Sequence, residues 1–453
     1  MTAPSALASP PPGRVHVVGA GLAGLAAAVE LADEGHKVTL YEAGAQAGGR
    51  CRSFFDAELG LRIDNGNHLL LSGNTAALAY IDRIGACGTF ERAAEAAIAF
   101  VDLATGERWT LRPGGGAVPW WVLSAARRVP GTRPQDYLAA LKLRRAAPGA
   151  TVAAVLGADT VLFRRLWQPL AVAALNTAIA DASASLFGRV LAETLGRGAA
   201  ACRPLLAREG LSESLIDPAL GFLARAGGEF RPGWRLRELD FAADRLAGLA
   251  FDAERIALRP DDSVILAVPA PVAARVVPDL VVPDDYAPIV NAHFRCAAPP
   301  GAPPFIGLVG GTAEWVCRRR EVLSVTVSAA DAIVGLNADE LRELLWRDVA
   351  RAFGLPAEPV PPARIIKERR ATFRATPAQL RRRPAAATRW PALHLAGDYV
   401  DTGLPATIEG AIRSGFAAAA RVRQRRAASA ASPGPMPPFE TPSPPQDCRR
   451  ALP

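Results

Sequence analysis

The sequence has no uninterrupted apolar run of the about 20 residues that a transmembrane helix needs. The longest candidates begin at Leu170 and Gly24 and have only the length of core helices. Residues 1–13, MTAPSALASPPPG, also lack the basic region and apolar core of a signal peptide, and they predict a disordered lead. These absences favour a cytoplasmic protein.

Cysteine and histidine are scarce, and neither is spaced as metal ligands or catalytic groups are. The chain has six cysteines and five histidines, with no Cys-x-x-Cys pair, no His-Glu-x-x-His motif and no nucleophile elbow. These absences argue against a zinc site, a disulfide scaffold and a Ser-His-Asp hydrolase. We therefore expect no metal and a reducing compartment.

Acidic residues are outnumbered by basic ones, which gives a formal net charge of +8 and a pI near 9.6. The basic residues are scattered singly and in pairs, apart from two Arg-Arg-Arg runs at 318–320 and 381–383. Such a distribution is typical of a solvated, arginine-rich surface, and we expect no nucleic-acid partner. A docking surface for anionic lipid is the alternative.

The strongest local pattern lies near the N-terminus, in RVHVVGAGLAGLAAAVELADEGHKVTLYEA. Residues 15–18 predict a short buried strand, an alanine-rich helix follows to about Glu34, and residues 38–41 predict a second strand that ends at Glu42. A G-x-G-x-x-G motif stands between strand and helix and consists of Gly19, Ala20, Gly21, Leu22, Ala23 and Gly24. The order of these elements predicts a dinucleotide site. An unrelated glycine-rich turn is the alternative.

Each part of this pattern has a physical role. Gly19 permits the tight turn, Gly21 lets the backbone approach a pyrophosphate, and Gly24 lets helix and strand pack closely. The amides at the helix start favour phosphate, and Glu42 is placed to accept hydrogen bonds from a ribose.

The continuation Gly48-Gly49-Arg50 resembles the two-dinucleotide-binding-domain flavoproteins, which implies FAD rather than NAD. In those proteins the paired glycines bring backbone against the cofactor, and the arginine reaches its phosphates. A purely structural Arg50 is the alternative.

Three distant segments together resemble the amine oxidase and carotenoid desaturase superfamily of FAD enzymes. They are residues 15–72, ending in FDAELGLRIDNGNHLLLSGN, then DDSVILAVPAPVAARVVP, and last HLAGDYVDTGLPATIEGAIRSG. The resemblance implies further FAD contacts from Gly66, Asn67, Val268, Pro269, Gly397, Asp398, Ala406, Thr407 and Ile408. Gly397 and Asp398 would meet the ribitol and pyrophosphate, and the following helix start would point its amides at the flavin pyrimidine oxygen. A capping or loop role for Asp398 is the alternative.

The same resemblance implies an α/β fold: a two-dinucleotide-binding-domain flavoprotein of the amine oxidase type, with a Rossmann-like FAD domain and an inserted α+β substrate domain. We place the discontinuous FAD-binding domain at 14–95, 205–275 and 362–425. The substrate domain is placed at 96–204, mostly helical, and at 280–361, with strands and a helix from about Ala338 to Phe353.

Two further segments stand out by composition and length. Residues 426–453 predict a disordered tail, because they are rich in Pro, Ser and Ala. The stretch between Phe241 and Val264 is short and leaves little room for the hairpin usual in the superfamily.

Within the superfamily, AGGRCRSFFDAELGLRIDNGNHLLLSGN most resembles the hydroxysqualene dehydroxylases of bacterial hopanoid synthesis. The resemblance implies a C30 polyprenoid substrate whose allylic hydroxyl leaves as water while reduced FAD supplies a hydride, giving squalene. The protein would protonate the leaving hydroxyl, exclude water and hold the carbon over the flavin. His68 and Asp64 lie in the segment that passes the flavin by resemblance, and they are the candidate catalytic residues. His68 is the candidate proton donor or hydroxyl positioner, with a structural histidine as the alternative, and no motif indicates the external reductant.

Because the implied substrate is a lipid, a membrane contact is also considered, and the candidate segment for it is GAVPWWVLSAARRVPGTRPQDYLAALKLRRA. Trp120 and Trp121 stand there close to Arg127 and Arg128, and tryptophan prefers the headgroup boundary while arginine prefers anionic lipid. This predicts a peripheral contact with the inner face of the membrane. A helical pair packed on the substrate domain is the alternative.

Three rival functions use the same fold. A carotenoid or phytoene desaturase would run the flavin in the oxidising direction, and motifs do not separate it from a dehydroxylase. An amine oxidase would want an aromatic cage before the last motif, where RATFRATP supplies only Phe373. A non-catalytic prenyl-lipid binding protein would have lost flavin contacts, whereas Glu42, Arg50 and Asp398 are all present.

Overall fold

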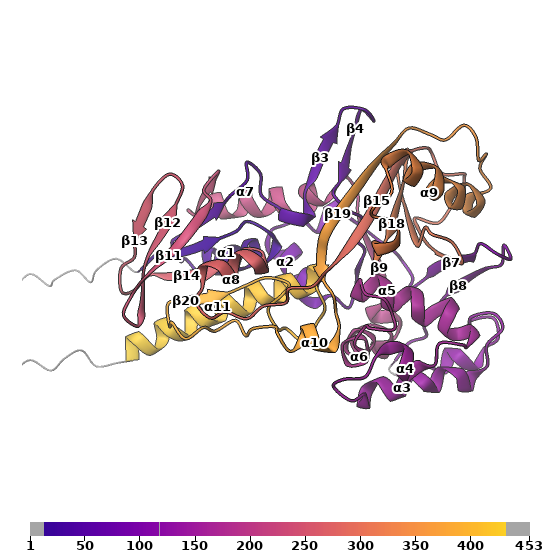
Figure 1. Cartoon of the computed structure of the whole chain (residues 1–453), viewed down its shortest axis with the longest axis horizontal. Coiled ribbons are helices and arrows are strands. Elements are labelled where there is room, and N and C mark those ends of the chain that lie inside the picture. Colours follow the sequence, from indigo (N-terminus) through magenta and orange to yellow (C-terminus); the bar gives the residue numbers. More distant parts are fainter. Residues whose placement is uncertain (1–12, 117, 432–453) are drawn as a thin grey trace, which may run out of the picture.

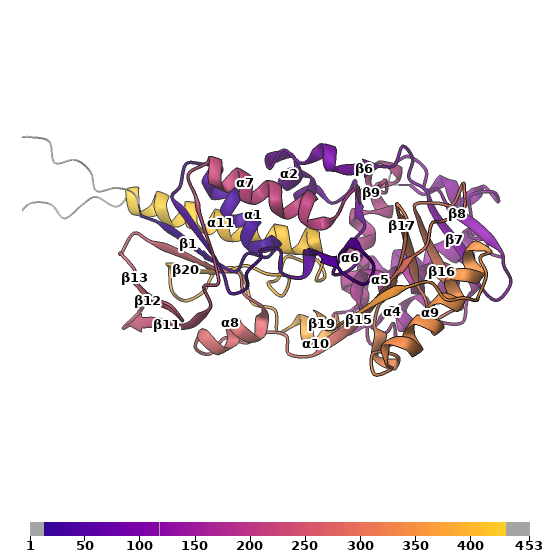
Figure 2. The same cartoon turned by 90° about the horizontal axis from the view of Figure 1, so that it is seen from above.

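Two sheets organise the molecule, which is elongated (Figure 1). The computed structural model describes residues 13–116 and 118–431. A five-stranded parallel sheet lies toward one end and a seven-stranded sheet toward the other, and Figure 2 shows the same division from above.

The parallel sheet has the order β10-β2-β1-β14-β20, and all neighbouring strands in it are parallel. Its strands are β10 (Glu229–Pro232), β2 (Val38–Glu42), β1 (Val15–Val18), β14 (Ser263–Leu266) and β20 (Leu393–Leu395). The strands β1 and β14 are short, mostly apolar and buried along their whole length, as burial on both faces of a parallel sheet requires. The predicted first strand and second strand are confirmed.

Helices cover one face of the parallel sheet. They are α1 (Leu22–Asp33), α7 (Asp217–Arg225) and α11 (Ile408–Ala431). A Cβ at Gly415 of α11 would lie 2.2 Å from the carbonyl oxygen of Ala23, so α1 and α11 pack almost backbone to backbone. Because α11 continues to Ala431, the predicted tail begins too early, and its remainder from 432, like residues 1–12 of the predicted lead, lies outside the described residues.

A small antiparallel sheet and a helix cover the other face. They are β11 (Leu236–Ala242), β12 (Arg245–Phe251), β13 (Arg255–Ala257) and α8 (Ala270–Val276). The expectation of little room for a hairpin here is wrong. Only two residues connect β11 to β12, and Ala243 takes a positive φ of 51° there, so a tight turn fits the hairpin into the short segment.

The seven-stranded sheet has the order β19-β15-β18-β17-β16-β7-β8, in which only β16 and β7 are parallel neighbours. Its strands are β19 (Ala363–Phe373), β15 (Tyr286–Arg295), β18 (Val322–Val327), β17 (Trp315–Arg319), β16 (Phe305–Val309), β7 (Ile98–Asp102) and β8 (Arg108–Leu111). The helix α9 (Ala338–Phe353), as predicted, covers one face.

A helical layer covers the opposite face of the seven-stranded sheet. It consists of short helices: η3 (Trp120–Leu123), η4 (Pro134–Leu138), α3 (Ala139–Lys142), η5 (Leu143–Arg145), α4 (Val152–Leu156), η6 (Phe163–Trp167), α5 (Gln168–Leu175), α6 (Ala184–Glu193), η7 (Leu195–Arg197) and η8 (Ala199–Ala201). Two placements differ from the expectation. The region 96–204 begins with the hairpin β7–β8 before it becomes helical, and β19, expected in the FAD domain, pairs with β15 in this sheet.

The remaining elements lie between the two sheets or pack beside the layers already described. They are η1 (Gly49–Cys51), β3 (Ser53–Asp56), β4 (Leu61–Asp64), β5 (Leu70–Leu71), α2 (Thr75–Arg83), η2 (Cys87–Thr89), β6 (Phe90–Arg92), β9 (Pro204–Ala207), η9 (Ser212–Ile216), η10 (Ala330–Ala332) and α10 (Pro377–Leu380). β3 pairs with β4, and β5, β9 and β6 form a three-stranded sheet.

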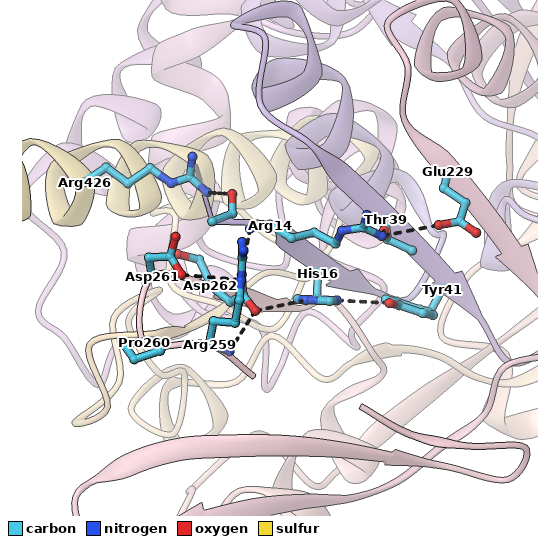
Figure 3. A network of polar contacts seen from close by, with 12 residues as sticks. Arg14, His16, Thr39, Tyr41, Glu229, Arg259, Pro260, Asp261, Asp262 and Arg426 are labelled. Atoms are coloured by element: carbon cyan, nitrogen blue, oxygen red, sulfur yellow. Dashed lines mark hydrogen bonds and ion pairs between the residues drawn. The ribbon is translucent and has the colours of Figure 1, made fainter. Parts of the chain in front are cut away.

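A polar network lies within the parallel-sheet half, on β1 and its neighbours (Figure 3). His16 Nδ1 lies 3.0 Å from the Tyr41 hydroxyl, and His16 Nε2 lies 3.9 Å from the Asp262 carboxylate, which also accepts the Arg14 amide. Burial lowers the pKa of His16 to about 4 and that of His394 to about 4, so both histidines are neutral core residues.

Across the described part of the chain, no helix has both the length and the apolar character needed to cross a membrane.

Candidate functional site

The carboxyl ends of the parallel strands meet at one edge of the sheet, where ligands of doubly wound α/β folds bind. β1 ends at Val18, directly before the glycine motif, and β2 ends at Glu42. β14 ends two residues before Val268, and β20 ends two residues before Gly397. The sheet therefore brings the glycine motif, Glu42, Val268 and Gly397 to the same edge.

The glycine turn after β1 has the geometry that a dinucleotide requires. Gly19 has a φ of 105°, and a Cβ there would lie 2.5 Å from the carbonyl oxygen of Ala267. A Cβ at Gly24 would lie 1.9 Å from the carbonyl oxygen of Gly19, so helix and turn touch. A Cβ at Gly21 would meet nothing within 4 Å. Two glycines are therefore required by packing, whereas Gly21 borders open space.

The start of α1 offers backbone donors to that space. Gly21 is its N-cap, and it supplies no side-chain hydrogen bond to the first turn. The amides of Leu22 and Ala23 stand in this first turn, where an α-helix has no intrahelical acceptors for them. The helix start therefore favours an anion.

Glu42 fixes the loops around the turn. Its Oε2 accepts the Ala20 amide at 2.9 Å and its Oε1 accepts the Gly44 amide at 2.8 Å. The next loop returns to the turn, because the Gly48 amide donates to the Ala20 carbonyl at 2.8 Å. Glu42 thus has a structural contact in addition to the ribose contact predicted for it.

Gly48 and Gly49 both need glycine. Their φ angles are 111° and 55°, and a Cβ at Gly49 would lie 3.5 Å from the Cα of Gly21. Gly49 therefore lies beside Gly21 of the glycine turn.

An ion pair joins the first and last motifs. Arg50 Nη2 lies 2.7 Å from Asp398 Oδ1, and Arg50 Nη1 donates to the carbonyl of Ala371. The Asp398 carboxylate raises the pKa of Arg50 despite the opposing effect of burial. Residues far apart in the sequence therefore form one charged pair at the sheet edge.

Arg383 orders the loop that follows Asp398, a role that the sequence did not reveal. Its buried guanidinium donates to four carbonyls of this loop, those of Asp398, Tyr399, Val400 and Leu404. The residue belongs to one of the two arginine runs interpreted as surface charge, and that interpretation is wrong for Arg383. Its only sequence signal is its place shortly before the last motif.

The last motif combines a strained glycine with a helix start. Gly397 has a φ of 148°, and its amide donates to Ser414 Oγ at 2.8 Å. Ala406 and Thr407 precede α11, which begins at Ile408, and Thr407 Oγ1 accepts the Gly410 amide at 3.1 Å. The predicted helix start is thus present at the sheet edge.

The remaining predicted cofactor residues lie on two connecting segments. Val268 is buried, and Pro269 is the N-cap of α8. A Cβ at Gly66 would lie 3.1 Å from Asn291 Nδ2, and Asn67 Nδ2 donates to Thr326 Oγ1 at 3.1 Å. The Gly66–Asn67 segment therefore joins the cofactor edge to the seven-stranded sheet.

Asp64 is fully occupied by structural contacts. Its Oδ1 accepts Ser53 Oγ at 2.6 Å and the Leu211 amide at 2.9 Å, and its Oδ2 pairs with Arg319 at 2.7 Å. These three partners hold the carboxylate in place. This placement argues against the predicted catalytic role of Asp64.

His68 lies close enough to Asp64 and Arg50 to feel both charges. Burial lowers its pKa, with the Arg50 charge acting in the same direction and Asp64 opposing it. His68 is therefore neutral at pH 7, and it suits the positioning of a hydroxyl better than the donation of a proton.

Glu314 is an acid that no sequence motif indicated. Its Oε2 accepts the Ser328 amide at 2.7 Å, and burial raises its pKa to about 7. The next amide, Ala329, donates to Asn176 Oδ1 at 2.6 Å. Ser328 follows Thr326, the partner of Asn67, by two residues of extended chain, a span of about 7 Å.

Comparisons with known proteins agree with this geometry. The model of the family of flavin containing amine oxidoreductases matches residues 22–423. The hydroxysqualene dehydroxylase of Rhodopseudomonas palustris is 48% identical over 406 residues, 89% of this chain and 97% of the relative. The hydroxysqualene dehydroxylase of Sinorhizobium fredii is 47% identical over 408 residues, 90% of this chain and 98% of the relative.

Solved structures show the same fold at low identity. Cyclohexylamine oxidase from Brevibacterium oxydans has a TM-score of 0.68 at 16% identity and covers 92% of this chain and 100% of that chain. The sequence match spans nearly the full length of the two dehydroxylases, and the glycine turn, Arg50 and Asp398 lie at one edge of the sheet. The chain therefore belongs to the flavin containing amine oxidoreductases and, within them, to the hydroxysqualene dehydroxylase family.

Proposed function

We propose that this protein is an FAD-dependent oxidoreductase that removes the hydroxyl of hydroxysqualene reductively to give squalene. The observation that carries the proposal is a complete dinucleotide edge in a chain related over about nine-tenths of its length to hydroxysqualene dehydroxylases, at 48% identity in one case. When bound, reduced FAD supplies the hydride for this chemistry.

The chain supplies the cradle for that cofactor. Gly21 and the first-turn amides of α1 fit the pyrophosphate, and Glu42 fits the ribose. Arg50 and Asp398 would hold the middle of the cofactor, and the start of α11 at Ile408 would offer its amides to the flavin pyrimidine. The open space at Gly21 supports this assignment, because its neighbours Gly19 and Gly24 have none.

The reaction balances with one proton and one hydride. Protonation of the allylic hydroxyl breaks the C–O bond and releases water, and the delocalised cation accepts a hydride from the reduced cofactor. The products are squalene, oxidised FAD and water. A further turnover would need an external electron donor for the cofactor.

Two side chains suit the handling of the hydroxyl. Neutral His68 would hold it by a hydrogen bond, since burial lowers the pKa of this histidine. Glu314 would donate the proton, because its pKa of about 7 keeps a large fraction protonated at neutral pH. The assignment of Glu314 is supported by its hydrogen bond with the Ser328 amide, because Ser328 lies two residues after Thr326, the partner of Asn67.

A C30 allylic alcohol is almost entirely hydrocarbon and partitions into membranes. We therefore propose that the protein works as a peripheral protein on the inner face of the cytoplasmic membrane. The five cysteines among the described residues are free, which suits a reducing compartment.

A single-turnover experiment tests the function. The purified holoprotein is reduced without oxygen and mixed with hydroxysqualene, and flavin absorbance and lipid products are followed together. We expect reoxidation of the flavin with equimolar squalene, and no reoxidation with squalene itself, which has no leaving group. A flavin that stays reduced, while the oxidised protein is bleached by phytoene, would replace the dehydroxylase with a desaturase.

A further inference from the structure

Exposed apolar side chains concentrate in one stretch of the helical layer. Seven large apolar side chains are exposed in the described part of the chain, and five of them lie between residues 118 and 141. They are Val118, Trp120, Leu123, Leu138 and Leu141, with exposed fractions of 52%, 69%, 61%, 61% and 56%. Single exposed apolar residues are ordinary, but a concentration of this kind marks an interaction surface.

Buried aromatic residues hold this stretch together. The rings of Trp121 in η3 and Tyr137 in η4 lie 5.4 Å apart in an edge-to-face contact, and the Tyr137 hydroxyl accepts the Val129 amide at 2.9 Å. Tyr137 also contacts Trp167 of η6. The predicted lipid contact of Trp121 is therefore wrong, because only 8% of this residue is exposed and it packs in the core. Its neighbour Trp120 is exposed, as are Leu123 of η3, Leu138 of η4 and Leu141 of α3.

The same stretch carries most of the excess positive charge of the chain. Residues 118–145 contain six basic residues and one acidic residue, which gives six minus one, or +5, of the chain's formal +8. The basic residues are Arg127, Arg128, Arg133, Lys142, Arg144 and Arg145. The one acid, Asp136, accepts the Arg133 amide at 2.7 Å in a helix cap. Unlike the scattered charge elsewhere, this cluster attracts an anionic surface.

The stretch occupies an edge of the molecule. Figure 1 shows α3 and α4 at the lower edge, with α9 at the upper edge on the other side of the seven-stranded sheet. The helical layer thus has an inner face on the sheet and an outer face that no described element covers at the five apolar residues.

We propose that the five apolar residues and the surrounding basic residues, here called the docking surface, bind a bilayer that contains anionic lipid. Apolar side chains enter the boundary between headgroups and acyl chains, and arginine and lysine meet the lipid phosphates. A second copy of this chain would bring two surfaces of +5 together, so like charges oppose a dimer there. The proposal rests on the proposed function in one respect: a substrate dissolved in the bilayer explains why the enzyme would bind the membrane.

Vesicle sedimentation of the full holoprotein tests the docking surface. Vesicles of phosphatidylcholine alone are compared with vesicles in which about a third of the lipid is phosphatidylglycerol, at low and high salt. We expect binding to the anionic vesicles that weakens at high salt. The double variant Trp120→Ser with Leu123→Ser and the double variant Arg144→Glu with Arg145→Glu should each reduce binding by about tenfold or more.

A matched control comes from β3. Phe55 is 65% exposed but lies outside the docking surface, so Phe55→Ser should bind like the unaltered protein. Flavin absorbance and thermal unfolding of all variants verify that they are folded. The proposal is overturned if the unaltered protein ignores anionic vesicles, if the double variants bind normally, or if they change the oligomeric state instead of vesicle binding.

Activity separates this proposal from the proposed function. Squalene formation from hydroxysqualene in detergent should not change in the double variants, whereas formation from vesicles should fall with binding. If the protein binds vesicles through these residues but makes no squalene in detergent, the docking surface stands and the dehydroxylase does not.

Discussion

The parallel-sheet half and the seven-stranded half hold their functional groups in different ways. Around Gly19, Gly21 and Gly24, the groups that fit a cofactor are backbone amides and spaces without a side chain. Around Glu314 and Asn176, the functional groups are ordinary polar side chains, and their properties come from burial and from partners in other segments. A site made of backbone geometry restricts residue types and leaves a motif in the sequence, whereas a site made by environment leaves none.

The largest expected effect tests whether the glycine turn is as rigid as this comparison requires. Gly24→Ala should prevent folding or cost more than about 4 kcal/mol, because the added methyl group meets the Gly19 carbonyl at 1.9 Å. Gly21→Ala is the matched variant, since its methyl group meets nothing within 4 Å. It should fold normally and lose about tenfold or more in FAD affinity. Thermal unfolding of the apoprotein and FAD titration measure the two effects, and equal behaviour of the two variants would contradict the comparison.

The second prediction extends the comparison to a side chain within the parallel-sheet half. Arg383→Met should lower the free energy of unfolding by about 3 kcal/mol or more, since it removes the donor for the carbonyls of residues 398–404. Arg381→Met is the control, because Arg381 belongs to the same run but is exposed. Denaturant unfolding compares them. If both variants are equally stable, the run is surface charge after all.

The third prediction concerns the seven-stranded half and its buried acid. Glu314→Gln should lower the hydride-transfer rate by about a hundredfold, or about 2.7 kcal/mol, because the amide cannot donate a proton. The unaltered protein should also slow as pH rises through about 7, since Glu314 loses its proton there. The variant should lack this dependence, as single-turnover rates between pH 6 and 8.5 would reveal. An unchanged pH profile would assign the proton elsewhere.

The same group predicts a pH dependence of stability. The pKa of Glu314 is raised in the folded protein, so between its ordinary value and about 7 the folded state keeps a proton that the unfolded state has released. Its contribution to stability therefore falls as pH rises through that window. Unfolding of Glu314→Gln should lack this contribution.

The smallest effect tests whether the two halves are energetically separable. Arg165 pairs with Asp102 at 3.0 Å and with Glu107 at 2.5 Å, and it stands over the Trp109 ring in the seven-stranded half. Arg165→Met should cost about 2 kcal/mol of stability, because it leaves Asp102 Oδ2 without its arginine partner. FAD affinity should not change, and a parallel loss of affinity would show that the halves are coupled.

Several features of the fold were predictable because they depend on neighbours in the sequence. The first strand, the helix after it and the second strand follow from a continuous apolar run, alanine-rich composition and the glycines between them. The helix α9 was predicted with its bounds, since Asn337 and Glu340 form a capping box and Gly354 ends it in a left-handed conformation. The hairpin β11–β12 was missed, because a two-residue turn at Ala243 carries no glycine to indicate it.

The candidate site was predictable only in part, for the same physical reason. Arg50 and Asp398 were recognised from their motifs, but their pairing at 2.7 Å depends on strands that lie far apart in the sequence. Asp64 appeared catalytic because of its position, and the structure gives it three structural partners instead. Trp121 looked like a lipid contact beside Trp120, yet the turn of η3 buries one tryptophan and exposes the other.

By itself the sequence determined the dinucleotide-binding unit, because glycine and helix starts act through the backbone within about 30 residues. It also determined the family, through motifs that follow from this geometry. Only the tertiary structure decided which arginine of a run is buried, which acid keeps its proton near pH 7 and which apolar side chains remain outside. Those properties depend on desolvation and on partners from distant segments, and a residue acquires them only when the chain has folded.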